Sequence, residues 1–183
     1  VNLIVMHPAL DQLIEVCLDL RVGHIVLAGG QPPGTAIAKI KGAERKLLCF
    51  APSLALAKRL VRSGADGLII EGMEAGGHIG SVSTAVLAQE ILPGMSDVPV
   101  FVAGGIGSGE GIAAFLGMGA AGVQMGTRFA CAEESIAHAR FKQAFIRASA
   151  RDAQPSVQID PAFKVIPVRA LANDGTRRFT ETQ

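Results

Sequence analysis

The segment Glu71–Gly80 combines side chains suited to proton transfer with several glycines. The carboxylates of Glu71 and Glu74 and the imidazole of His78 follow directly after a short apolar run. Histidine titrates near neutral pH, and the glycines on either side of it permit close approach to a ligand. A solvated turn with an incidental histidine is the alternative interpretation. The glycine-rich setting favours His78 as the catalytic, proton-handling residue.

Two glycine-rich turns later in the chain have the composition of phosphate-binding loops. Ala103–Gly109 follows an apolar run and precedes a helix-like segment, and Gly126–Thr127 lies one strand–helix unit further on. Backbone N–H groups at a helix N-terminus bind phosphate well when no side chain holds the anion away. A purely structural turn would explain either segment alone. Because they occur in neighbouring units, together they indicate a phosphate site.

Six short apolar runs alternate with helix-like segments along the chain. Continuously apolar runs suit parallel strands that are covered on both faces, and their alternation with helices implies a parallel sheet. Ser53 and Ser108 are expected to cap helices that end near Gly64 and Gly119. The expected strands are Leu3–Met6, His24–Ala28, Leu47–Phe50, Gly67–Ile70, Val98–Ala103 and Gly122–Met125.

An open doubly wound sheet and a closed barrel both satisfy this alternation. Polar or glycine-rich residues follow several of the strands, which is typical of a barrel, whereas a dinucleotide-binding doubly wound sheet concentrates its glycines after the first strand. We therefore predict an α/β fold of the (β/α)8, or TIM, barrel class. Residues 1–150 are expected to supply about six βα units, strands 3 to 8 of the barrel. Residues 151–183 lose this rhythm and are predicted to form an irregular, truncated C-terminal extension.

Four stretches resemble the nitronate monooxygenase family, formerly called 2-nitropropane dioxygenases, and the closely similar FMN-dependent enoyl-acyl-carrier-protein reductases. They are Val1–Asn2, the segment from Gly64 to His78, Ala103–Ile106 and Gln124–Phe129. Both enzyme groups use a barrel that binds flavin mononucleotide (FMN), so the resemblance implies FMN as the cofactor, with NAD(P)H as an alternative source of electrons. The residues predicted to bind the cofactor, from the resemblance and the two turns, are Asn2, Glu71, Ala75, Gly76, Gly77, Gly104, Gly105, Ile106, Gln124, Met125, Gly126 and Thr127.

The resemblance leaves the activity open. In the leading interpretation His78 assists proton removal, and an alkyl nitronate is oxidised by oxygen through reduced flavin. The rival is NAD(P)H-dependent reduction of an enoyl thioester, which suits Glu71, because many nitronate monooxygenases carry Gln there and the enoyl reductases commonly carry Glu. A third interpretation, from another class, is an inactive flavin-binding module, since one fold hosts many functions.

The composition narrows the choice of partners. A net charge of +1, from 17 basic and 16 acidic residues, gives no field that would attract nucleic acid or an anionic membrane. The apolar runs are much shorter than the roughly 20 residues of a membrane span. A small-molecule substrate is therefore expected, and a homodimer is the assembly considered.

The cysteines and the chain ends give further expectations. Three widely separated cysteines argue against a disulfide framework and favour the cytoplasm, and no ligand spacing indicates a metal. The family begins with two strands ahead of the part that resembles Val1–Asn2. Because a closed barrel removes unpaired strand edges, we expect the natural protein to be longer at its N-terminus.

Overall fold

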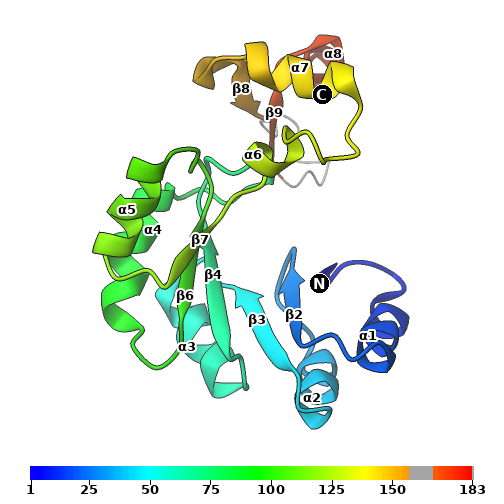
Figure 1. Cartoon of the computed structure of the whole chain (residues 1–183), viewed down its shortest axis with the longest axis vertical. Helices are drawn as coiled ribbons and strands as arrows, with labels where there is room; N and C mark the ends of the chain where they lie inside the picture. Colours follow the sequence, from blue (N-terminus) through cyan, green and yellow to red (C-terminus); the bar gives the residue numbers. More distant parts are fainter. Residues whose placement is uncertain (157–166, 183) are drawn as a thin grey trace.

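The main element of the computed structural model, which describes residues 1–156 and 167–182, is a six-stranded parallel sheet (Figure 1). Its strand order, β1-β2-β3-β4-β6-β7, follows the chain. A doubly wound sheet reverses its order at a switch point, so the sequential order is that of a barrel, and the fold is six βα units of a (β/α)8 barrel. The strands are β1 (Asn2–Ile4), β2 (His24–Ala28), β3 (Lys46–Phe50), β4 (Gly67–Glu71), β6 (Val100–Ala103) and β7 (Gly122–Gln124).

Helices follow the strands and lie on the outer side of the curved sheet (Figure 1). Ser53 and Ser108 cap two of them as predicted, each accepting a hydrogen bond from the N–H three residues further on. Gly64 (φ +108°) follows the first of these helices and Gly119 (φ +99°) follows the second. Both helices therefore end in the same type of helix-to-strand connection, with a glycine in a positive-φ conformation. The helices around the sheet are α1 (Leu10–Asp19), α2 (Gly34–Gly42), α3 (Leu54–Arg62), α4 (Thr84–Ile91), the 3-10 turn Leu92–Gly94 and α5 (Gly109–Gly117).

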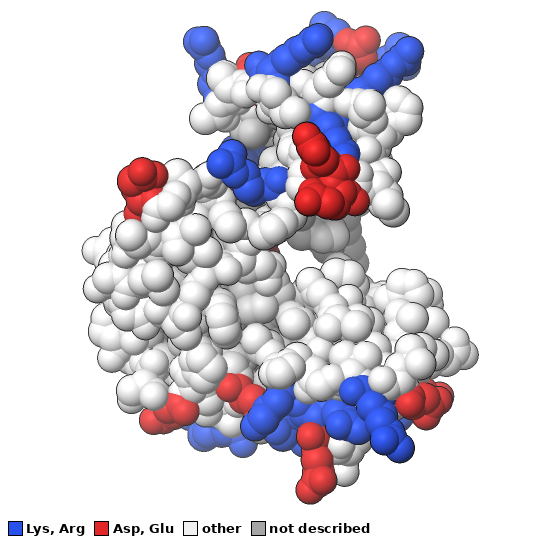
Figure 2. Space-filling view, in the orientation of Figure 1, with Lys and Arg blue, Asp and Glu red and all other residues white. Residues whose placement is uncertain are grey.

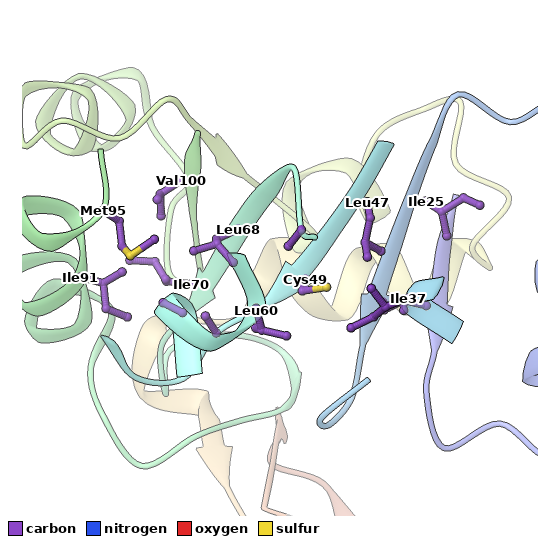
Figure 3. Packing of buried hydrophobic residues seen from close by; sticks show 14 of the residues in the cluster. Ile25, Ile37, Leu47, Cys49, Leu60, Leu68, Ile70, Ile91, Met95 and Val100 are labelled. Carbon is purple, nitrogen blue, oxygen red and sulfur yellow. The ribbon is translucent and has the colours of Figure 1, made fainter. Parts of the chain in front are cut away.

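The hydrophobic core lies between one face of the sheet and these helices (Figure 3). Alternate strand residues are fully buried there, whereas Val26, Leu48 and Phe101, which point to the other face, are half-buried. Helices therefore cover one face of the sheet in the described residues, as in a barrel. The buried residues labelled in Figure 3 include Ile25, Ile37, Leu47, Cys49, Leu60, Leu68, Ile70 and Ile91.

A charged cluster joins the starts of β3 and β4, at the end of the sheet away from the candidate site. Asp66 accepts hydrogen bonds from Lys41 Nζ (2.5 Å), Lys46 Nζ (3.1 Å) and the backbone N–H of Leu47 (2.9 Å). Burial alone would raise the pKa of Asp66, but these hydrogen bonds outweigh it and lower the pKa to about 2. Asp66 therefore stabilises the N-terminal ends of two strands.

The residues after β7 form a small layer over the C-terminal ends of the strands (Figure 1). The prediction that the chain is irregular from residue 151 onward was wrong, because regular strands and a helix occur there. These strands are too short, and too poor in apolar runs, for periodicity to reveal them. The division of the chain near residue 150 stays a prediction. The layer contains α6 (Thr127–Ala130), α7 (Ala139–Arg147), the 3-10 turn Ala150–Asp152, β8 (Ala153–Pro155), β9 (Val168–Leu171) and α8 (Asp174–Thr182).

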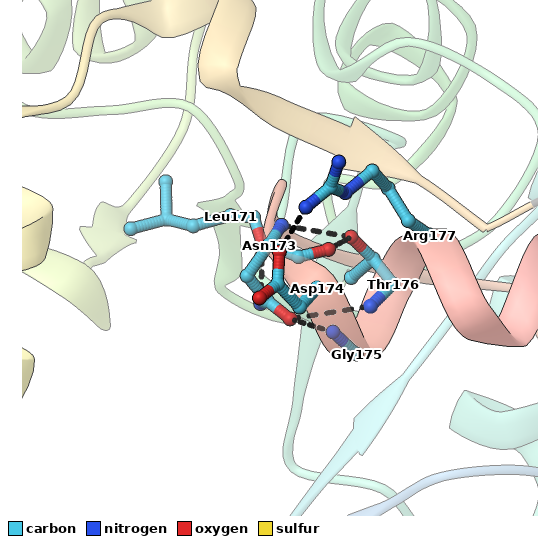
Figure 4. A network of polar contacts seen from close by, with 6 residues as sticks. All are labelled: Leu171, Asn173, Asp174, Gly175, Thr176 and Arg177. Carbon is cyan, nitrogen blue, oxygen red and sulfur yellow. Dashed lines mark hydrogen bonds and ion pairs between the residues drawn. The ribbon is translucent and has the colours of Figure 1, made fainter.

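A second, antiparallel sheet joins this layer to the loop after β4. Its strand order is β5-β9-β8, where β5 is Gly77–His78. Asn173 then caps the start of α8, because its Oδ1 accepts from the N–H groups of Gly175 (2.8 Å) and Thr176 (3.2 Å) (Figure 4).

Within the described residues, no helix has both the length and the apolar character needed to cross a membrane.

Candidate active site

A cleft of about 830 Å³ lies between the C-terminal ends of β4, β6 and β7 and the C-terminal layer. Figure 2 shows the molecule hollowed beneath the C-terminal layer, with charged side chains gathered mainly above and below the hollow. This volume is within the usual range for ligand and cofactor sites. All but one of the predicted cofactor-binding residues line the cleft, namely Glu71, Ala75, Gly76, Gly77, Gly104, Gly105, Ile106, Gln124, Met125, Gly126 and Thr127.

Three strand ends meet at the floor of the cleft. Glu71 is the register partner of Ala103 in β6, and Ala103 is in turn the partner of Gln124 in β7. Because the strands are parallel, their C-terminal residues lie at the same end of the sheet. Backbone pairing thus holds the carboxyl group of Glu71 and the primary amide of Gln124 at the floor of the cleft. Burial raises the pKa of the half-buried Glu71 above its ordinary value.

This burial gives a testable expectation for stability in the absence of any ligand. A carboxyl group whose pKa is raised by folding destabilises the folded protein as pH rises through that pKa, and the cost disappears below its ordinary value of 4.5. We expect Glu71→Gln to raise the thermal unfolding midpoint at pH 8 and to leave it nearly unchanged in acid. The exposed Glu134→Gln is the matched control. Equal midpoints for wild type and Glu71→Gln at pH 8 would contradict the expectation.

Glu74, three residues further on, is engaged within the protein. Its Oε2 accepts hydrogen bonds from the backbone N–H and from the hydroxyl of Thr84, both at 2.8 Å, at the start of α4. Partial burial raises the pKa of Glu74, but the hydrogen bonds from Thr84, helped by the charge of Arg169, outweigh it and lower the pKa. Glu74 therefore ties the loop after β4 to α4 as an ionised carboxylate.

Glycines allow the loops after β4 and β6 to pack against each other. A Cβ atom on Gly72 would lie 2.1 Å from the backbone nitrogen of Thr84, which no side chain could accommodate. Gly104 and Gly105 have φ angles of +98° and +72°, in the region that favours glycine. A Cβ on Gly105 would also lie 2.9 Å from Cβ of Glu74. The two glycine-rich segments singled out in the sequence thus form one wall of the cleft.

His78 and Asn2 do not line the cleft. His78 is exposed in β5, directly after the lining residue Gly77, and its backbone pairs with Val168 in β9. The backbone of His78 therefore lies next to a cleft-lining residue, but its side chain does not line the cleft. Asn2 is exposed in β1, at the opposite edge of the sheet from β7. Their predicted roles stay predictions.

Several cleft residues were not predicted from the sequence. Arg169 comes from β9, Cys131 follows α6, and the C-terminal layer supplies an apolar wall from α7. In that wall the rings of Phe141 and Phe145 are in contact, with centroids 4.6 Å apart and planes tilted by 47°. The i, i+4 spacing of Phe141 and Phe145 places these two residues on one face of a helix, which is the signal that could have found them.

Comparison with known proteins assigns the chain to a family. The family model described as Nitronate monooxygenase matches residues 3–183. The chain belongs to the nitronate monooxygenase family. The resemblance inferred from the sequence is thereby confirmed.

Among curated relatives of this family member is a (3aS,4S,5R,7aS)-5-hydroxy-7a-methyl-1-oxo-octahydro-1H-indene-4-carboxyl-CoA dehydrogenase from Rhodococcus jostii, 37% identical, matching 85% of this chain and 42% of the relative. A nitronate monooxygenase from Pseudomonas aeruginosa is 33% identical, matching 72% of this chain and 40% of the relative. The solved structure of FabK from Thermotoga maritima has a TM-score of 0.91 and 37% identity, covering 99% of this chain and 56% of that one. The chain therefore spans about half the length, or less, of these relatives.

The cleft of this nitronate monooxygenase family member has groups suited to a phosphate-bearing flavin. A Cβ built on Gly107 or Gly126 would meet nothing within 4 Å, so at these points the bare backbone faces open space. Arg128, beside Gly126 and Thr127, adds a cation to the lining. Backbone N–H groups with a nearby guanidinium are typical partners of phosphate. In the part of the chain that the structure describes, no group of His, Cys, Asp and Glu is arranged to hold a metal ion.

Proposed function

We propose that this chain is the flavin-binding part of an FMN-dependent oxidoreductase of the nitronate monooxygenase type, which oxidises alkyl nitronates with oxygen. The observation that carries the proposal is the gathering of the predicted cofactor-binding residues in one cleft, at the strand ends where barrel enzymes place their active sites. When bound, FMN would supply the electron transfer from substrate to oxygen.

Residues of the cleft floor would hold the cofactor. The turns at Gly104–Gly105 and Gly126–Thr127 offer backbone N–H groups for the phosphate, and Arg128 offers a positive charge. Glu71 and Gln124 offer polar side chains at the adjoining strand ends. Because burial raises the pKa of Glu71, its carboxyl group is better able to donate a hydrogen bond than an exposed one.

We assign proton handling to His78. It is exposed to solvent and directly follows Gly77, which lines the cleft, so the proposal requires its imidazole to turn toward a substrate held there. Glu74 is less suited to this work, because two hydrogen bonds from Thr84 occupy its Oε2 and lower its pKa. The apolar wall of Phe141, Phe145 and Ile146 would take the alkyl part of the substrate.

A second candidate function is NAD(P)H-dependent reduction of an enoyl thioester. It is favoured by the relative whose name includes a carboxyl-CoA group, and by the glutamate at position 71. The same cleft would then hold FMN with NAD(P)H as the electron donor. A flavin-binding module without activity is the third alternative.

The experiment that separates these functions is anaerobic stopped-flow mixing of the flavoprotein with an alkyl nitronate and, separately, with NADPH. We expect the nitronate to bleach the flavin absorbance within the turnover time, because electrons then leave the substrate directly. Bleaching by NADPH alone would favour the enoyl thioester reductase. Bound FMN that neither reagent reduces would contradict both enzyme assignments and leave the binding module.

We also propose a cytoplasmic location and a small-molecule substrate. The three cysteines are widely separated in the sequence, which suits a reducing compartment. A homodimer stays a prediction, which analytical ultracentrifugation of the whole protein would test.

A further inference from the structure

Arg169 joins two segments of the chain that border the cleft. From the middle of β9, its Nε donates a hydrogen bond to the carbonyl oxygen of Met73 (2.8 Å), and its Nη1 donates to the carbonyl oxygen of Ala153 (2.5 Å). Met73 belongs to the loop after β4, and Ala153 begins β8. A single planar guanidinium thus bridges the C-terminal layer and the cleft loop, and it also lines the cleft.

The loop that receives this contact depends on partners outside itself. Gly77 has φ +85°, and glycines at 72, 76, 77 and 80 leave the segment with little conformational preference of its own. Backbone pairing of Gly77 with Arg169 and of His78 with Val168 makes β5 a strand, and Ile79 N–H donates to Pro167 O (2.9 Å). The C-terminal part of the loop, residues 77–79, is therefore positioned by β9.

The N-terminal part of the loop is held by hydrogen bonds at Met73 and Glu74. Met73 N–H donates to Val82 O (2.8 Å), and Glu74 accepts from Thr84. The charge of Arg169 also helps to lower the pKa of Glu74. Arg169 therefore contacts the start of the loop in two ways, by a hydrogen bond to the Met73 carbonyl and by the attraction of its charge for the Glu74 carboxylate. The next three residues, Ala75, Gly76 and Gly77, line the cleft.

We infer that Arg169 is a positioning residue of the cleft: its guanidinium holds the segment Met73–Ile79 against the C-terminal sheet, so that the residues facing the cofactor keep their place. This inference rests on the proposed function for its consequence, the binding of FMN. The contact itself is independent of that function. A bridge to two carbonyls needs the fork of an arginine, because a lysine ammonium is a compact point charge that cannot match that planar geometry.

The test compares Arg169→Lys with wild type by hydrogen exchange and by FMN titration. Lysine keeps the positive charge near Glu74 and removes the fork. The amide of Ile79 is expected to exchange about 10-fold faster or more, because the charge-assisted hydrogen bond that holds its loop at Met73 is lost. The dissociation constant for FMN is expected to rise by about 10-fold, with a shifted visible spectrum of any bound flavin. Arg177→Lys, which changes an exposed arginine that pairs with Asp174 in α8, is the matched control and should behave as wild type.

Three outcomes would overturn the inference. The first is unchanged exchange at Ile79. The second is faster exchange that extends equally to Leu68, whose amide donates to Pro99 O within the barrel, since Arg169 would then only stabilise the fold. The third is local loosening with unchanged FMN affinity and spectrum. If wild type binds no FMN at all, the proposed function fails, and the contrast between Ile79 and Leu68 still decides whether Arg169 holds the loop.

Discussion

Gly105→Asp is expected to abolish retention of FMN during purification while leaving a folded protein. The substitution places a carboxylate in the wall that we assign to the phosphate, so like charges repel in a partly enclosed site. It also faces Glu74, whose Cβ would lie 2.9 Å from the new Cβ. Flavin absorbance relative to protein absorbance, measured on the purified variant, gives the retained fraction.

Gly105→Asn is the matched control for charge. Asparagine has the size of aspartate and tolerates the left-handed φ of +72° better than most residues, so it shares the steric change without the negative charge. We expect it to keep part of the flavin that Gly105→Asp loses. A folded Gly105→Asp protein with a full complement of FMN would remove this turn from the phosphate site.

His78→Ala is expected to keep FMN and to slow the proton-transfer step by a factor on the order of 10². Removing a proton from carbon requires a group that titrates near the working pH, and histidine is the residue type that does so without perturbation. The proposed phosphate contacts lie in other loops, so cofactor binding should survive. Neutral nitroalkanes should lose more activity than preformed nitronates, which have already lost that proton.

Steady-state kinetics with both substrate forms measure this difference. His24→Ala, which removes an exposed histidine at the start of β2, far along the chain from the cleft loops, is the control and should match wild type. Unchanged kcat/KM for both forms of the substrate in His78→Ala would exclude His78 from catalysis. Glu71, with a raised pKa at the cleft floor, would then be the next residue to test.

The parallel sheet was predictable because each of its strands is a short apolar run. His24–Ala28 has the predicted bounds, and β4 ends one residue later than predicted, at Glu71. The barrel class followed from the glycine-rich and polar residues after several strands, and the sequential strand order agrees with it. Local composition was sufficient to predict the strands, because burial against the helices requires apolar residues at the strand positions themselves.

The C-terminal layer and its share of the cleft were not predictable in the same way. Strand β5 consists of a glycine and a histidine, and it is a strand only because β9 pairs with it. Arg169 reached the cleft through that pairing, and nothing in its neighbourhood along the chain points to Met73. The sequence placed Glu74 near the chemistry, but its engagement by Thr84 required the packing of α4 against the loop. Contacts between distant segments leave no periodic signal.

The bond from Arg169 to Met73 spans 96 residues of chain, and this separation has a consequence for how the protein is made. Closing so long a loop costs entropy that must be met before the contact is formed, and contacts of high sequence separation slow folding. During synthesis from the N-terminus, the strands of the barrel segment emerge and can pair while the loop after β4 still lacks its partner strand. The cleft is therefore expected to mature last, once β9 has left the ribosome. A nascent chain stalled before residue 168 should accordingly have a protease-sensitive loop at 73–80 on an otherwise ordered sheet.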